Sequence, residues 1–220
     1  MCGRYTLSTT ANFKKRFGIL GQVPKFDKSY NVSPSTYNPV IVRNSPNKVL
    51  MMKWGFIPEW SKDRKFLLIN IRRESLKEKP YFKKVLVSRR CLIPADGFYE
   101  WKKVVLEKVE EKIPYYFHLA GRKIFSFAGL YSLLSDAEGK PIYTYAIITC
   151  PPNKVISQVH NRMPVILNKK DEDYWLDPDN KDTDKLSDLL LPYSNTLKLY
   201  PVGRGINNPV NDSQSLIKRV

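Results

Sequence analysis

The stretch CLIPADGFYEWKK, residues 91–103, begins a series of four closely spaced runs rich in β-branched and aromatic residues. The others are residues 113–121, 123–134 and 142–150. Runs of this kind, separated by turn residues, predict β-strands. The charged segment 104–112 lies between the first two runs and predicts the tip of a β-hairpin. The centre of the chain is therefore predicted to form β-sheet.

Shorter elements are expected on both sides of this centre. Helical spacing predicts helices in residues 9–19, with Thr9 or Thr10 as cap and Gly18 as stop, and in residues 151–160. Residues 72–90 predict a helix that is interrupted near Pro80, and residues 48–58 predict a strand that ends at Pro58. We therefore predict a mixed α+β fold and a single domain over residues 1–220, with a tail that frays beyond about residue 210.

The charge balance is strongly positive. The chain has 37 Lys and Arg against 21 Asp and Glu, which gives a formal net charge of +16. A field of this size favours a polyanionic partner, most simply nucleic acid, over a basic surface that only keeps the protein in solution. No long apolar run predicts a membrane span.

The cysteines and histidines exclude two classes of site. Three cysteines without a CxxC pair are typical of a reducing cytosol and not of a disulfide framework. Two histidines far apart in sequence give no zinc-ligand spacing, so we expect neither a metal nor another cofactor. Cys91 and Cys150 lie in or beside strand-like runs and are expected to be inert core residues.

Cys2 is the cysteine that requires an explanation. If Met1 is removed, Cys2 carries a free α-amine and a thiol on adjacent carbons. Such a 1,2-aminothiol condenses with an aldehyde to a thiazolidine ring, which an internal cysteine does not do. Both groups have reference pKa values of about 8, so neither needs a large shift to react near neutral pH. The alternative is that Cys2 only begins a strand.

Polar residues inside apolar runs are the candidates for proton transfer and positioning. Glu100 lies in an aromatic strand, His160 follows a predicted helix, and Asn70 lies in the apolar run 67–71. A buried glutamate has a raised pKa, and imidazole titrates near neutral pH, so both suit proton transfer. Each residue taken alone also has a purely structural interpretation. The candidates for phosphate contact are Arg4, Arg72 and Arg162, and those for stacking on bases are Trp54, Phe56, Trp60 and Trp101.

The ordered set of motifs resembles one family. MCGRY at residues 1–5, INIRRES at 69–75, RCLIPADGFYEW at 90–101 and HNRMPVIL at 160–167 resemble the SOS-response-associated peptidase (SRAP) family, whose members cross-link to abasic sites in single-stranded DNA. YNVSPS and WGFIPEW lie between them in the same order. The resemblance implies a twisted, barrel-like, mainly antiparallel β core flanked by short helices.

The resemblance also implies a role for each candidate residue. Cys2 would form a thiazolidine with the abasic-site aldehyde, Asn70 would position its amine, and Glu100 and His160 would move protons. Arg4, Arg72 and Arg162 would hold the DNA backbone, and Trp101 would stack on bases. Asn31, Pro34 and Trp54 would line the DNA channel. Two positions depart from the family pattern: Ile71 replaces an expected alanine, and Asn161 replaces an expected aspartate.

Three functions therefore compete. The first is a sensor and shield of abasic sites in single-stranded DNA, with Schiff-base chemistry of the lyase type. The second is a thiol peptidase with Cys2 as nucleophile and His160 as base, in its modest form limited to removal of Met1. The third is a non-covalent binder of single-stranded DNA. We expect a cytoplasmic, nucleoid-associated monomer without membrane contact, with replication-fork or single-/double-strand junction DNA as a further candidate partner.

Overall fold

More residues lie in strands than in helices, as the aromatic and β-branched runs predict. A computed structural model describes residues 2–43, 46–61, 64–106 and 109–220. Its strands are β1 (Arg4–Leu7), β2 (Ser29–Val32), β3 (Tyr37–Val42), β4 (Lys48–Trp54), β5 (Asn70–Arg72), β6 (Arg90–Ala95), β7 (Gly97–Leu106), β8 (Val109–Leu119), β9 (Phe125–Ser135), β10 (Pro141–Cys150), β11 (Met163–Pro164), β12 (Ile166–Leu167) and β13 (Leu197–Pro201). Its α-helices are α1 (Phe13–Arg16), α2 (Arg73–Glu78), α3 (Pro80–Ser88), α4 (Lys169–Leu176) and α5 (Thr183–Asp188).

A closed barrel forms the core and confirms the expected fold class. Within the described residues, β10, β4, β3, β6 and β9 pair in that order and β9 pairs back with β10, with only β10 and β4 running parallel. β6 is buried along its whole length. Gly129 on β9 allows this closure, because a Cβ there would overlap the side chain of Ile93 and approach the carbonyl oxygen of Ala146 at 2.9 Å.

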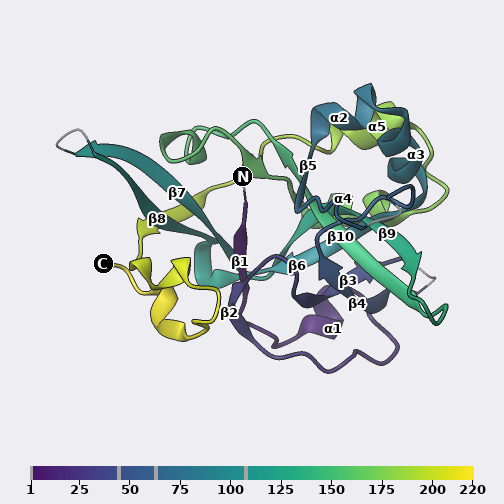
Figure 1. Ribbon diagram of the computed structural model, residues 1–220, viewed down its shortest axis with the longest axis horizontal. Coiled ribbons are helices and arrows are strands. Elements are labelled where there is room, and N and C mark those ends of the chain that lie inside the picture. Colours follow the sequence, from purple (N-terminus) through teal and green to yellow (C-terminus); the bar gives the residue numbers. More distant parts are fainter. Residues whose placement is uncertain (1, 44–45, 62–63, 107–108) are drawn as a thin grey trace.

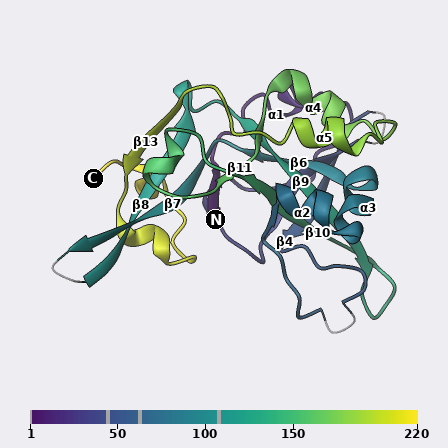
Figure 2. The ribbon, with the colours of Figure 1, turned by 90° about the horizontal axis from the view of Figure 1, so that it is seen from above.

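A second sheet lies against the barrel. Its order over the described residues is β13-β8-β7-β1-β2, and each strand runs antiparallel to its neighbours. β7 and β8 form the expected hairpin, which projects from one end of the molecule, while α2, α3 and α5 gather at the other end (Figures 1 and 2). The expected tip falls partly on residues 107–108, outside the described residues. β5 pairs with β10 of the barrel, so sites that combine β5 with β1 or β7 lie where the two sheets meet.

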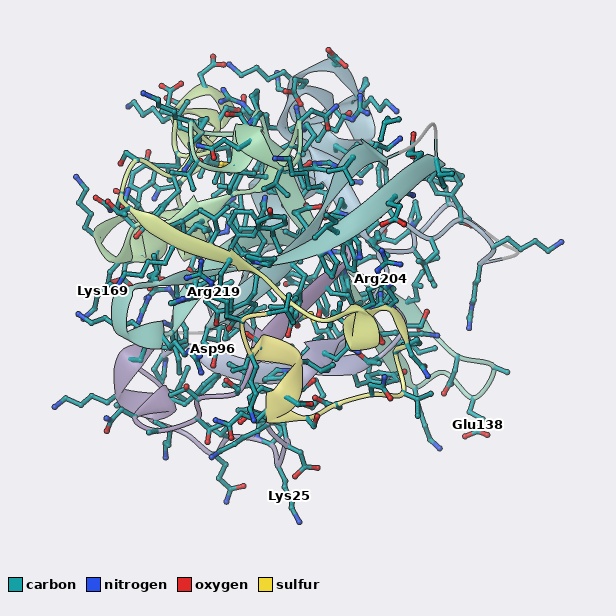
Figure 3. The ribbon with its side chains drawn as sticks, turned by 90° about the vertical axis from the view of Figure 1, so that its left-hand side faces the viewer. Lys25, Asp96, Glu138, Lys169, Arg204 and Arg219 are labelled. Carbon is teal, nitrogen blue, oxygen red and sulfur yellow. The ribbon has the colours of Figure 1, made fainter. Side chains whose placement is uncertain are left out.

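A buried carboxylate fixes the N-terminal strand. Asp96, which is buried and is labelled in Figure 3, accepts hydrogen bonds at Oδ2 from the backbone N–H groups of Ser8 (2.8 Å) and Thr9 (2.7 Å). Its Oδ1 accepts from the hydroxyl of Thr6. Charged residues such as Lys25 and Glu138 instead point outward in the same view. The network holds β1 in register with β7 and thereby fixes the position of Cys2.

Several expected element boundaries were wrong. The first helix is a single turn, Phe13–Arg16, whose N-cap is Asn12 in a left-handed conformation and not a threonine. Gly18 does end it, with φ +62°. The strand from Lys48 ends at Trp54, four residues before Pro58, because the next residue, Gly55, turns the chain with φ +135°. Residues 151–160 hold only a short 3₁₀ turn, Ile156–Gln158. The break near Pro80 is confirmed, with α2 and α3 on either side.

The C-terminal tail is packed, contrary to the expected fraying. Leu216 and Ile217 are buried in a small hydrophobic cluster with Tyr99 and Tyr116. The Asn31 side chain donates hydrogen bonds to the carbonyl oxygens of Asn208 (3.0 Å) and Asn211 (2.7 Å) in the segment before them. Apolar burial and these bonds together oppose fraying of the terminus.

Among the described residues, no helix is both long enough and apolar enough to span a membrane.

Candidate active site

The site is built around Cys2, the residue that precedes β1. Its side chain is fully buried. The amide Nδ2 of Asn70, on β5, donates a 2.9 Å hydrogen bond to the carbonyl oxygen of Cys2. The other amide atom of Asn70, Oδ1, is buried and has no hydrogen-bond partner among the described residues. The Asn70 side chain therefore holds Cys2 from the barrel side through Nδ2, and its Oδ1 is available to accept a further hydrogen bond.

Glu100 approaches Cys2 from the other sheet. It lies on β7, which pairs with β1, and its side chain is almost fully buried. Burial raises the pKa of Glu100 from its ordinary 4.5 to about 7. The pKa of the Cys2 thiol is also raised, first by burial and then by the nearby negative charge of Glu100. Near neutral pH the carboxyl group is thus able to donate or accept a proton, whereas the thiol is protonated.

His160 lies beside Glu100. Its Nε2 lies 4.0 Å from Oε2 of Glu100. Its Nδ1 lies 3.1 Å from the backbone nitrogen of Arg162 and 3.2 Å from the carbonyl oxygen of the same residue, so the Arg162 loop holds the ring with Nε2 toward the carboxyl group. Burial lowers the pKa of His160, which keeps the ring neutral at physiological pH.

An ion pair holds the loop that carries His160. Both terminal nitrogens of Arg162 donate to the carboxylate of Glu74, at 2.8 and 2.9 Å. One of them also donates to the carbonyl oxygen of Thr149 at 2.7 Å. The Arg162 guanidinium lowers the pKa of Glu74. A bidentate contact of this kind fixes both position and orientation, so Glu74 on α2 positions Arg162, and Arg162 positions His160.

Two cavities flank these residues. One, of about 750 Å³, is lined by Glu100, His160, Trp101 and hairpin lysines. The other, of about 410 Å³, is lined by Asn70, Arg72 and a group of aromatic side chains. Cys2 interacts with a residue of each cavity, Asn70 in one and Glu100 in the other. Cys2 itself is fully buried and is not among the residues that line either cavity.

Comparison with known sequences identifies the family. The family described as SOS response associated peptidase (SRAP) matches residues 1–209.

The chain belongs to the SRAP family.

Two sequence relatives and one solved structure are similar to this SRAP chain over most or all of its length. It is 44% identical over 225 residues to the Abasic site processing protein YoqW of Bacillus subtilis (strain 168), with 99% of each chain covered. It is 29% identical to the Abasic site processing protein HMCES of Xenopus tropicalis, which covers 88% of this chain and 66% of that protein. A crystal structure of a protein from Bacteroides thetaiotaomicron matches all of both chains with a TM-score of 0.85 and 26% identity.

The expected DNA contacts of the SRAP chain fall into two groups. Arg72 is exposed at the end of β5, and Trp101 is partly exposed, with its Nε1 donating to Oδ1 of Asn207 at 2.8 Å. Pro34 is partly exposed in the turn between β2 and β3, and Arg4 is half-buried on β1. These four remain candidates for DNA contact. Arg162 is occupied by Glu74, which explains why the loop is ordered although Asn161 offers it no charge.

Two of the expected channel residues are instead structural. Trp54 is fully buried, donates from Nε1 to the carbonyl oxygen of Ile69 (2.9 Å), and stacks on Tyr145 with ring centroids 6.3 Å apart. Asn31 is buried and holds the C-terminal segment. Polar or aromatic residues in a turn-rich or strand-like sequence do not reveal which way the side chain faces, and here both face inward. Phe56 is likewise buried, whereas Trp60 is 58% exposed.

Replacing Trp54 by alanine is expected to destabilise the fold by about 3–5 kcal/mol, because it leaves a large cavity in a closed barrel and removes one of the two hydrogen bonds that the Ile69 carbonyl oxygen accepts. Urea unfolding of the variant measures this loss. Trp60→Ala is the matched control, since the same side chain is lost from the surface and a much smaller change should follow. Equal losses in the two variants would contradict the structural assignment of Trp54.

Glu74 is the site residue that sequence reasoning missed. It stands 88 positions from Arg162 in the chain, and nothing in the segment INIRRES indicates that distant partner. A carboxylate among arginines in a basic protein reads as local charge balance, so only the fold reveals the pair.

Replacing Glu74 by glutamine should loosen the Arg162 loop and change the hydrogen bonds of the His160 imidazole to that loop. Nitrogen-15 NMR of the imidazoles measures this directly, since the chain has two histidines. His118 is an internal control: it lies on β8 of the second sheet, where its Nδ1 is 2.7 Å from the carbonyl oxygen of Leu119. Only the His160 signals should change. Unchanged signals from both rings would remove the positioning role of Glu74.

Proposed function

We propose that the protein processes abasic sites in single-stranded DNA by forming a covalent bond through Cys2. Its family and the names of its relatives support the lesion as substrate. The observation that carries the covalent step is the approach to Cys2 of Asn70 from one sheet and Glu100 from the other, with His160, from the loop before β11, beside Glu100.

The chemistry requires Cys2 to be the first residue. Its α-amine attacks the aldehyde carbon of the ring-opened deoxyribose and forms a C–N bond; loss of one water gives a Schiff base. The thiol sulfur then adds to the C=N carbon of the protonated Schiff base and passes its proton to the adjacent base. The C=N electron pair returns to the nitrogen, which keeps its proton and becomes the secondary amine of a thiazolidine. The overall change is one condensation that releases one water and needs no oxidant or cofactor.

The site residues fit the order of these steps. Because the thiol pKa is raised, the sulfur is not ionised at the start, and the amine attacks first. The protonated form of Glu100 donates a proton that opens the closed sugar, and its carboxylate form later accepts the thiol proton, with His160 as its neighbour in both steps. The unused Oδ1 of Asn70 is an acceptor for the α-amine beside the carbonyl group that Nδ2 already binds.

The thiol-peptidase alternative has weaker support. A nucleophilic cysteine is activated by a lowered pKa, and burial and Glu100 both raise that of Cys2. The nearest acid–base pair consists of Glu100 and His160, which is suited to proton shuttling, and the net charge of +16 favours a polyanion over a peptide.

Mixing the protein with an oligonucleotide that carries one abasic site tests the proposal. Denaturing gels and intact mass should show a product equal to protein without Met1 plus DNA minus one water. An oligonucleotide with a tetrahydrofuran residue, which has no aldehyde, is the matched control and should bind without a covalent product. Absence of any adduct would contradict the covalent step and favour non-covalent binding of single-stranded DNA as the function. An adduct formed by protein that still begins with methionine would show that the α-amine of Cys2 is not the nucleophile.

A further inference from the structure

The outer half of the β7–β8 hairpin has no strand beside it. β1 pairs with β7 only at residues 97–99, and β13 pairs with β8 only from Tyr115 onward. Beyond these points the two strands pair with each other among the described residues, and the hairpin projects from the body (Figure 1). The two strands thus form an arm that extends outward from Glu100.

The arm presents lysines to the cavity that contains the proton-transfer pair. Lys102, Lys103 and Lys112 line the cavity of about 750 Å³, at whose inner end Glu100 and His160 lie. Lys103 and Lys112 stand directly opposite each other in the antiparallel ladder. Like charges in this position repel and destabilise the hairpin, so a bound anion would relieve a cost that the free protein bears.

The acidic residues of the arm do not neutralise all of this charge. Glu110 pairs with Lys103 at 3.1 Å. Glu111 pairs with Arg204, from the segment after β13, at 2.6 Å; Arg204 is labelled in Figure 3. Neither Lys102 nor Lys112 has an ion-pair partner among the described residues. The wall of the cavity therefore keeps a positive excess next to the reacting groups.

We propose that Lys102 and Lys112 bind backbone phosphates of the single strand on one side of the lesion, so that the arm is a phosphate-binding wall. This inference rests on the proposed function and adds a surface that the arginine set does not include. Trp101 lies between the lysines and Glu100 in sequence and lines the same cavity, which places an aromatic face where the first base beside the lesion would lie. The arm then determines how many nucleotides on that side contribute to affinity.

The salt dependence of binding measures these contacts. On single strands, each neutralised phosphate contributes about −0.7 to the slope of log binding constant against log salt concentration. With the tetrahydrofuran oligonucleotide, Lys102→Gln/Lys112→Gln should reduce the slope by about 1.4. Shortening the oligonucleotide from one end should weaken wild-type binding more than binding by this variant. Lys14→Gln/Lys15→Gln, on exposed positions of α1, makes the same change in net charge and should retain the wild-type slope.

The outcomes separate this inference from the proposed function. An unchanged slope in the arm variant, or an equal decrease in both variants, would overturn the phosphate-binding wall even if the wild-type protein forms its adduct. Absence of an adduct from wild-type protein and the abasic oligonucleotide would overturn the proposed function, whatever the slopes are. Thermal melting must show that both variants are folded at the temperature of the binding measurement, because the measured quantity is binding by the folded protein.

Discussion

Replacing Cys2 by alanine should abolish the stable thiazolidine adduct and leave salt-sensitive DNA binding in place. The variant loses the sulfur that closes the ring, while the lysines, arginines and Trp101 are unchanged. Its amine should still form a reversible Schiff base, which a reducing agent such as borohydride would trap. The measurement is a denaturing gel with the abasic oligonucleotide, with and without reductant. An adduct of undiminished yield without reductant would contradict the role of Cys2.

Two further changes separate the amine from the thiol. Inserting one alanine before Cys2 keeps the thiol but converts its amine into a peptide N–H, so the thiazolidine should not form. Cys2→Ser keeps the amine and replaces sulfur by a weaker nucleophile, so a transient Schiff base and strand scission should replace the stable product. A thiol peptidase that needs no free terminal amine would survive the alanine insertion.

Replacing Glu100 by glutamine should slow adduct formation and at the same time stabilise the fold. Proton transfer by a positioned side chain contributes about 10²–10⁴-fold, and glutamine neither donates nor accepts the proton. The wild-type rate should rise as the α-amine deprotonates and fall as Glu100 loses its proton above about pH 7. The variant should lack the fall at high pH. Single-turnover rates from about pH 5 to about pH 9, a range that spans the titration of both the α-amine and Glu100, measure both effects.

The stability effect has the opposite sign because the carboxyl group is buried. The pKa of Glu100 is raised in the folded state, so the folded protein binds more protons than the unfolded chain between pH 4.5 and about 7, and stability falls as pH rises through that window. Above about pH 7 the whole loss is present. Because one pKa unit corresponds to about 1.4 kcal/mol, Glu100→Gln should gain at most about 3 kcal/mol at pH 8 and little at pH 4. Denaturant unfolding at the two pH values checks the sign, and an equal gain at both would contradict it.

The sequence was most informative where a local pattern has one structural solution. Alternating aromatic runs predicted the strands of the centre, Pro80 predicted the break between α2 and α3, and Gly18 predicted the end of the first helix. Burial of Cys91 and Cys150 is confirmed as well. These features depend on backbone conformation and on the hydrophobic effect, both of which neighbouring residues determine.

Inference failed where the outcome depends on distant partners. Trp54 and Asn31 have polar or aromatic character that suits DNA contact, yet the barrel interior and the C-terminal segment take up their hydrogen bonds. Glu74 has no local signal at all, since its partner lies on another element. The roles of Asn70, Glu100 and His160 stay predictions, although the fold brings all three residues to the start of β1.

The packed tail makes the two ends of the chain unequal as places for engineering. Val220 is 74% exposed, so a purification tag fused after it would extend into solvent without disturbing Leu216 or Ile217. Deleting the last residues would instead uncover Tyr99 and Tyr116. At the other end, a tag that leaves even one residue ahead of Cys2 removes the free 1,2-aminothiol. We expect such protein to fold and bind DNA but to form no thiazolidine.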